Sequence, residues 1–153
     1  MELKSTEVIE IVSELIEFVD KKFENNEKTI KGATNLKYKI YANAKNEYRY
    51  KNFLLKGFVG QGRLKICDVG IAFLYGKNKI NDGFYICFVY NYRKKEIYLE
   101  LGSSYENISK LSENKKSEFN KKSTKKISRI NLNYSDLIIK IDDILKEFLQ
   151  FYK

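Results

Sequence analysis

The chain has 153 residues, 43% of them hydrophobic, which is enough for one domain with a packed core and too apolar for a chain that is disordered throughout. Its 29 Lys and Arg residues outnumber its 20 Asp and Glu residues, and the net charge of +9 favours a polyanionic partner. No apolar run approaches the roughly 18 residues of a membrane span, and acidic residues interrupt the apolar runs near the N-terminus, which argues against a signal peptide. We therefore expect a single cytoplasmic domain over residues 1–153, with no membrane partner.

A helix is expected over residues 5–23. Ser5 can cap its N-terminus, and Glu7 lies in the first turn, where the helix dipole favours a carboxylate. Acidic residues elsewhere bring residues 1–29 to eight carboxylates against four Lys, a net charge of −4. The apolar residues that recur at helical spacing are Val8, Ile11, Val12, Leu15, Phe18, Val19 and Phe23.

Residues 30–66 carry nine cations against the single anion Glu47, a net charge of +8. Within this block, residues 33–46 fit a short helix better than a strand, because Ala, Lys and Asn outnumber β-branched residues. A second basic block, residues 104–130, holds eight cations against three anions. This concentration of positive charge indicates a basic face directed at a partner.

Four strands are expected from short apolar runs that are separated by turn residues. The third is entered through an Asn-Asp-Gly turn at residues 81–83, and only a short basic connection joins it to the fourth. That short connection predicts an antiparallel hairpin. The four runs are residues 52–59, 69–74, 84–92 and 96–101.

Residues 104–130 are polar with sparse apolar anchors, and we expect a loosely packed helix or a partly mobile segment there. An amphipathic helix is expected over residues 135–151, where apolar residues again recur at helical spacing. The whole pattern predicts an α+β fold. It would consist of a mixed, mostly antiparallel sheet of about four to five strands, flanked by N- and C-terminal helices.

The stretch that follows the first strand is a glycine turn with two cations after it. Gly60 and Gly62 permit positive φ and let another backbone or a phosphate approach closely, with Gln61 between them. Arg63 and Lys65 follow at alternate positions, so an extended chain points both to one face. Two interpretations stay open: a glycine hairpin with solvated charges, or a loop that contacts nucleic acid.

Twelve tyrosines, many of them beside cations, support the nucleic-acid interpretation. Aromatic rings can stack on bases while neighbouring cations bind phosphates. The alternative is that most of these rings line the edge of the core and keep their hydroxyls in water. The tyrosines concerned are Tyr38, Tyr41, Tyr48, Tyr50, Tyr85, Tyr90, Tyr92 and Tyr98.

Most catalytic chemistry lacks its residues in this chain. There is no histidine, and the glycines match neither a phosphate-binding loop nor a dinucleotide-binding motif. Cys67 and Cys87 lie in apolar runs and are expected to be reduced and buried, with no metal site and no cofactor. The enzymatic alternative is a small metal-dependent nuclease built on Asp68, Asp82 and Glu100, although solvated or turn-capping carboxylates explain the same residues.

Four segments, in order, resemble a known family. They are residues 56–62 (Lys-Gly-Phe-Val-Gly-Gln-Gly), 70–74 (Gly-Ile-Ala-Phe-Leu), 82–86 (Asp-Gly-Phe-Tyr-Ile) and 96–102 (Glu-Ile-Tyr-Leu-Glu-Leu-Gly). Together they resemble the N-terminal domain of McrB-type modification-dependent restriction proteins, over about residues 50–103.

The resemblance implies a DNA-binding module that has no catalysis of its own. Such a module reads modified double-stranded DNA by flipping a modified cytosine into a pocket, while a separate GTP-dependent motor and a nuclease carry out the cleavage. By position, Gln61 and Val89 match residues that line the pocket. Tyr85 matches the residue that wedges into the base stack, and Gln61 could pair with a base edge.

We expect Lys56, Arg63 and Lys65 to bind phosphates beside this pocket. The chain departs from the family at Leu64 and Gly70, where family members often have Trp, so two walls that would stack on a flipped base are missing. The alternative without DNA is a protein-interaction module of a phage-defence assembly. Its interface would be formed by the tyrosines and the C-terminal helix.

Overall fold

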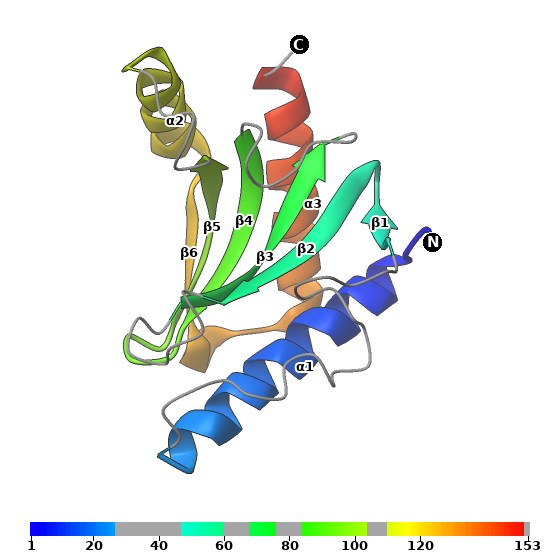
Figure 1. The fold of residues 1–153 in the computed structure, drawn as a ribbon, viewed down its shortest axis with the longest axis vertical. Helices are drawn as coiled ribbons and strands as arrows, with labels where there is room; N and C mark the ends of the chain where they lie inside the picture. The colour runs from blue at the N-terminus through cyan, green and yellow to red at the C-terminus, as the bar shows by residue number, and fades with distance from the viewer. Residues whose placement is uncertain (27–46, 60–67, 76–83, 104–109, 152–153) are drawn as a thin grey trace.

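The computed structural model describes residues 1–26, 47–59, 68–75, 84–103 and 110–151 (Figure 1). Within them, three α-helices flank a six-stranded sheet in which each strand pairs antiparallel with the next one in the chain. The expected α+β class is confirmed, with six strands instead of four to five. The elements are α1 (Ser5–Glu24), β1 (Arg49–Tyr50), β2 (Phe53–Val59), β3 (Asp68–Tyr75), β4 (Phe84–Asn91), β5 (Glu96–Ser103), α2 (Lys110–Ser123), β6 (Lys125–Ser128), the 3-10 turn η5 (Arg129–Asn131) and α3 (Tyr134–Phe151).

Local hydrogen bonds explain where the two long helices begin. In α1 the Glu7 carboxylate accepts the backbone N–H of Lys4 at 2.9 Å, so Lys4 is the capping position and Ser5 is the first helical residue. The expectation that Ser5 caps this helix is therefore wrong by one residue. At α3, Oδ1 of Asn133 accepts two backbone N–H groups of the first turn, at 2.9 and 3.2 Å.

Tight turns join neighbouring strands. β1 runs into β2 through Lys51 and Asn52, whose φ angles of 49° and 69° are both positive, as a two-residue hairpin turn requires. The Lys51 ammonium lies 3.2 Å from a carboxylate oxygen of Asp142, which helps to hold this turn. Between β4 and β5, Lys95 N–H donates to the Tyr92 carbonyl at 3.1 Å, and the antiparallel hairpin expected there is confirmed.

The basic segment after β5 contains a helix and a short strand. α2 is anchored by Phe119, whose buried ring packs edge-on against Phe148 and Phe151 of α3 at centroid distances of 6.3 and 5.3 Å. β6 pairs with the first half of β5, and beyond that pairing Oδ1 of Asn120 accepts the N–H of Leu101 at 2.8 Å. Of the two alternatives left open for this segment, the structure has the helix over α2, whereas the strand β6 was not expected.

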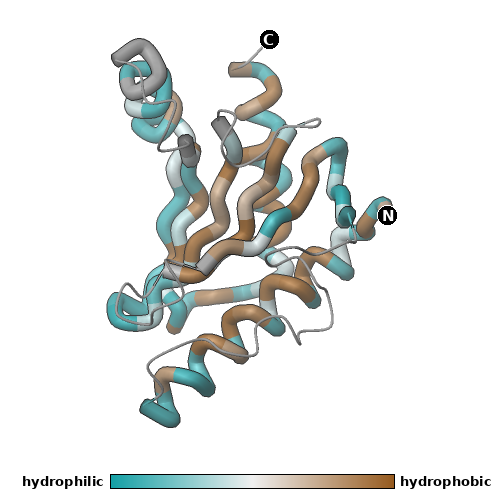
Figure 2. Tube along the Cα trace, viewed as in Figure 1, coloured by the Kyte–Doolittle hydropathy of each residue, from teal (hydrophilic) through white to brown (hydrophobic). Residues whose placement is uncertain are grey.

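One side of the sheet, which we call the first face, carries the main hydrophobic core. α1 and α3 both pack on it, and Figure 1 shows α3 running behind the sheet. Figure 2 shows apolar residues along the central strands and along α1, whereas α2 is largely hydrophilic. Burying these side chains supplies most of the stability of the fold. The completely buried strand residues on this face are Phe53, Ile71, Phe73, Ile86, Phe88, Tyr90, Ile97, Leu99 and Leu101.

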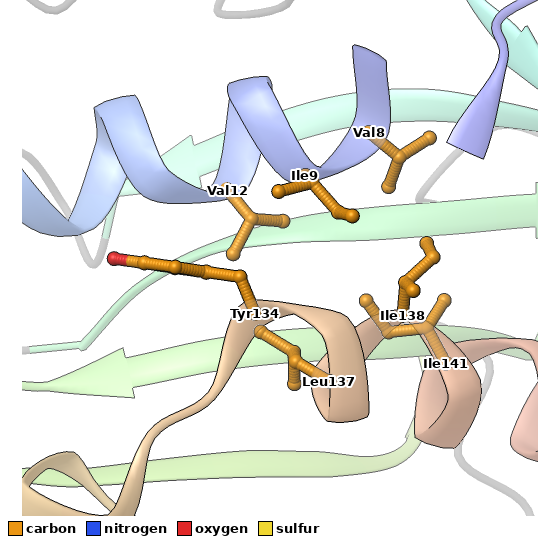
Figure 3. Close-up of a pocket in the computed structure, with 7 residues that line it drawn as sticks. All are labelled: Val8, Ile9, Val12, Tyr134, Leu137, Ile138 and Ile141. Carbon is orange, nitrogen blue, oxygen red and sulfur yellow. The ribbon is translucent and has the colours of Figure 1, made fainter. Parts of the chain in front are cut away.

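α1 and α3 also pack directly against each other (Figure 3). The seam between them leaves no room for a water molecule, so it is a packing contact and not a ligand site. It is lined by Val8, Ile9, Val12, Tyr134, Leu137, Ile138 and Ile141.

Two buried tyrosines link the sheet to these helices. The Tyr90 hydroxyl donates to Asp20 of α1 at 2.5 Å, and the Tyr50 hydroxyl donates to Asp142 of α3 at 2.6 Å. Burial first, and then the adjacent carboxylate, raises the pKa of both tyrosines above their usual range. Arg129 Nε lies 3.5 Å from the other Asp20 oxygen. These polar contacts join segments that are distant in sequence and fix how each helix lies on the sheet.

Other expectations are settled only where the structure describes the residues. Cys87 is buried with a free thiol, as expected. Cys67 and the helix expected over residues 33–46 lie outside the described residues. In the described part of the chain, no helix is both long enough and apolar enough to cross a membrane.

Candidate functional site

The other side of the sheet, which we call the second face, is built from the alternate residues of the same strands. The register brings Lys56, Ala72 and Cys87 into one row across β2, β3 and β4. α1 and α3 pack on the opposite side, so they do not cover this row. The residues of the second face are Leu54, Lys56, Phe58, Gly70, Ala72, Leu74, Tyr85, Cys87, Val89, Asn91, Glu96, Tyr98, Glu100, Gly102 and Lys126.

Two aromatic rings of the second face lie against glycines of the neighbouring strand. A Cβ atom at Gly70 would come within 2.7 Å of Phe58 Cζ, and a Cβ atom at Gly102 would come within 2.5 Å of Tyr85 Cε2. In both pairs the ring and the glycine are direct partners across antiparallel strands. The missing side chains therefore let the rings lie along the sheet and cover bare backbone, a known way of stabilising glycine in a sheet.

Phe58 and Tyr85 also pack against a small apolar cluster, and both stay partly exposed. Burial and, less strongly, the neighbouring Cys87 raise the pKa of Tyr85 to about 12, so its hydroxyl is neutral at physiological pH. The cluster consists of the buried residues Leu54, Ala72 and Leu74.

Positive charge borders the second face on the side of β6 and α2. Lys126 Nζ lies 5.9 Å from the centre of the Tyr98 ring and 3.2 Å from a Glu96 oxygen. The Tyr98 hydroxyl donates to Glu96, and this bond is the main cause of the lowered pKa of that carboxyl. Burial and then the negative charge of Glu100 raise the pKa of the Cys87 thiol above its usual range, and the charge of Lys116 on α2 opposes that rise less strongly.

Three of the predicted site residues are described, and all three belong to the second face. Lys56 shares its row with Cys87, and Cys87 lies between Tyr85 and Val89 on β4. Neighbouring strands are about 4.8 Å apart, so the Lys56 backbone on β2 lies roughly 10 Å from the Cys87 backbone on β4. The predicted residues that lie outside the described part of the chain are Gly60, Gln61, Gly62, Arg63 and Lys65.

The sequence did not reveal how the rings are arranged. Phe58 belongs to the apolar run expected over residues 52–59, and strand alternation puts its side chain on the same face as that of Lys56. The contacts with Gly70 and Gly102 have no local signal, because they depend on the register between two strands. The tip of the Tyr85 ring lies over Gly102. Its role as a wedge in the base stack stays a prediction.

The backbones of the two described residues of the nuclease alternative lie far apart in the sheet. Asp68 pairs with Asn91, which pairs with Glu96, so Asp68 and Glu100 are two strands and four residues apart. This offset separates their backbones by about 17 Å. Asp82 lies outside the described residues. Among the residues that the structure describes, no group of three His, Cys, Asp or Glu side chains could hold a metal ion.

Two other surfaces fit a polyanion or a protein partner less well. A shallow hollow of about 440 Å³ on α1 is acidic and would repel phosphate. The apolar stripe of α3, which the protein-interaction alternative would use, is buried in the core, and Ile139 is the large apolar side chain that α3 leaves exposed, at 57%. The hollow is lined by Glu14, Glu17, Phe18, Asp20, Lys21 and Glu24.

Comparison with known proteins finds no matching family model, no matching curated protein and no matching solved structure.

Proposed function

We propose that this protein is a DNA-binding specificity module that binds DNA through the second face of its sheet. The observation that supports the proposal is that Lys56, Tyr85 and Val89, which come from two strands, belong to this one face, while the acidic helix α1 packs on the other. Lys126 adds a cation at its border, where it also pairs with Glu96. Cations that neutralise phosphates and rings that contact bases are the two components of nucleic-acid binding.

In this proposal the module recognises a modified base in double-stranded DNA, in the manner expected of a McrB-like restriction system. The modified base is flipped into a pocket that includes Gln61 and Val89, and Tyr85 fills the gap left in the stack. The module has no catalysis and needs no metal or cofactor. A GTP-dependent motor and a nuclease supply cleavage in the cytoplasm. The phosphate contacts are Lys56, Arg63 and Lys65.

Binding measured against salt concentration tests the phosphate contacts. The logarithm of the affinity should fall linearly with the logarithm of salt, and Lys56→Gln should reduce the slope by about 0.9. The double change of Arg63 and Lys65 to Ala should reduce it by about twice as much. Lys146→Gln, at an exposed position of α3, is the matched control and should leave the slope unchanged. A slope that Lys56→Gln does not alter would remove the second face from the interface.

Matched duplexes with and without 5-methylcytosine test base readout separately. The protein without substitutions should prefer the methylated duplex. Tyr85→Ala should keep the nonspecific affinity for DNA but lose this preference. If the protein binds both duplexes equally at every salt concentration, base readout fails. Sequence-independent binding by the cations would then stand on its own.

A further inference from the structure

We infer that the second face binds unpaired bases, and that Phe58 and Tyr85 are two surfaces on which such bases stack. This inference rests on the proposed DNA binding, but it takes the ligand to be nucleic acid that contains an unpaired strand instead of an intact duplex, with Tyr85 as a stacking surface instead of a wedge. The evidence is the arrangement of the two rings, their exposure and the positions of the surrounding cations.

Each ring lies along the sheet instead of standing away from it. In Phe58 both Cζ and Cε1 lie within 3.0 Å of the point where a Gly70 Cβ would be, and in Tyr85 both Cε2 and Cζ lie within 2.9 Å of the equivalent point at Gly102. The far end of each ring therefore crosses to the next strand. One side of each ring rests on backbone, and both side chains remain partly exposed.

A ring that lies along a sheet can stack only on a base whose flat face is accessible. Bases inside a duplex expose their edges in the grooves, and their faces are covered by the neighbouring pairs. An unpaired base exposes its face to any aromatic side chain, and stacking of this kind tolerates every base. The geometry of both rings therefore suits unpaired bases better than an intact duplex.

To contact both rings, a nucleic-acid strand must cross the sheet diagonally. Gly70 and Gly102 are two strands and four residues apart in register, which corresponds to about 17 Å. A stacked strand covers this distance with roughly five nucleotides at 3.4 Å each, and a more extended strand needs fewer. Lys56 lies in the row between those of the two rings, where it can neutralise a phosphate of the same strand.

Positive charge distinguishes a nucleic-acid ligand from an apolar peptide. Lys126 belongs to the row that contains Phe58 and Tyr98, and it also pairs with Glu96 at 3.2 Å. Lys56 lies in the adjacent row, which ends at Glu100 on β5. Aromatic rings interleaved with cations form a surface that is complementary to an unpaired strand, in which bases and phosphates alternate.

Three oligonucleotides of one sequence, compared at one salt concentration, provide the test. They are a single strand, its full duplex, and a duplex with an internal unpaired stretch. The single strand and the interrupted duplex should bind at least about tenfold more tightly than the full duplex. A 2-aminopurine in the single strand should lose emission on binding because it stacks on a ring, whereas release from a base stack would increase its emission.

Phe58→Leu and Tyr85→Leu assign the effect to the rings. Both changes keep an apolar side chain over the glycine, and each should weaken single-strand binding about fivefold or more while leaving duplex binding unchanged. Phe58→Tyr and Tyr85→Phe retain the rings and should retain the affinity. Tyr75→Leu is the control, because this tyrosine is 45% exposed at the end of β3 and its strand partner Phe53 belongs to the first face.

The outcomes separate the inference from the proposed function. Preference for the single strand, together with sensitivity to both Leu changes, supports the stacking surfaces. Equal or tighter binding of the full duplex, or a single-strand preference that neither Leu change alters, overturns them and leaves DNA binding intact. If no oligonucleotide binds at any salt concentration, the proposed function fails as well. If a Leu variant does not fold by circular dichroism, the comparison of oligonucleotides with the unchanged protein decides.

Discussion

The two faces of the sheet use the same strands in different ways. On the first face, large apolar side chains occupy each row. Two helices cover them, so the exposed fraction of these side chains is zero or close to zero. On the second face, the middle of β3 and the end of β5 carry Gly70, Ala72 and Gly102, and rings from neighbouring strands lie over both glycines. Alternate residues of one strand therefore meet different surroundings on the two faces, so substitutions on each face can be compared independently.

The largest expected effect compares adjacent residues of β4. Phe88 is completely buried on the first face, and its replacement by Ala should lower the free energy of unfolding by about 3–5 kcal/mol. Val89 lies on the second face and is partly exposed, so Val89→Ala should cost about 1 kcal/mol. Urea unfolding measures both changes. Equal losses would mean that the second face is packed as tightly as the first.

The second prediction concerns the glycines beneath the rings. Gly102→Ala should cost about 1–3 kcal/mol, because the new methyl group would meet the Tyr85 ring at 2.5 Å. A Tyr85→Ala background should relieve part of this cost, whereas Gly70→Ala should stay destabilising in a Phe58→Ala background, because the Phe88 carbonyl oxygen would be 2.1 Å away. Double-mutant cycles of unfolding measure the difference. Lack of coupling between Gly102 and Tyr85 would contradict the described contact.

A smaller effect compares the hydroxyl of a completely buried tyrosine with that of a partly exposed one. Tyr90→Phe removes the donor to Asp20 on the first face and should cost about 1–2 kcal/mol, because a partly buried carboxylate loses a partner. Tyr98→Phe removes the bond to Glu96 on the second face, where water replaces it, and should cost less. Thermal unfolding at neutral pH ranks the two variants. The opposite ranking would show that the hydroxyl bonds of the second face hold the fold.

The smallest effect is expected at alkaline pH. Burial raises the pKa of Tyr85 from its ordinary value of 10.0 to about 12, so folding favours the neutral phenol. Its contribution to stability is complete below pH 10.0 and is lost as the pH rises towards 12. The free energy of unfolding should therefore decline across this range, and Tyr85→Phe should decline less steeply. The ultraviolet absorbance of tyrosinate, recorded in parallel, should show Tyr50 and Tyr90 ionising after the exposed tyrosines.

The sequence predicted the long elements because each is specified by its own residues. α1 and α3 have apolar stripes at helical spacing, and the four central strands begin and end within two residues of the expected positions. β1 and β6 are two and four residues long, and β6 begins with two lysines. Such segments are strands because a neighbouring strand offers unpaired N–H and C=O groups, which periodicity within one segment cannot reveal.

The candidate site was predictable to the extent that strand alternation determines it. The sequence marked Lys56, Tyr85 and Val89, and the structure puts all three on one face. Which side α1 and α3 cover, and which glycine each ring meets, depend on the register between strands and on helix packing. The glycine loop that follows β2 lies outside the described residues, so its role in phosphate binding stays a prediction.

The position of α3 after the whole sheet in the chain affects how the protein is made. A ribosome adds about 5–20 residues per second, so roughly 2 to 10 seconds separate the synthesis of β5 from the completion of α3. During this interval Phe53, Phe73 and Phe88 lack the helix that later covers them, and the nascent chain presents an apolar surface. Such a surface is a binding site for chaperones and a starting point for aggregation. The emergence of α3 therefore determines when the nascent chain is protected from both.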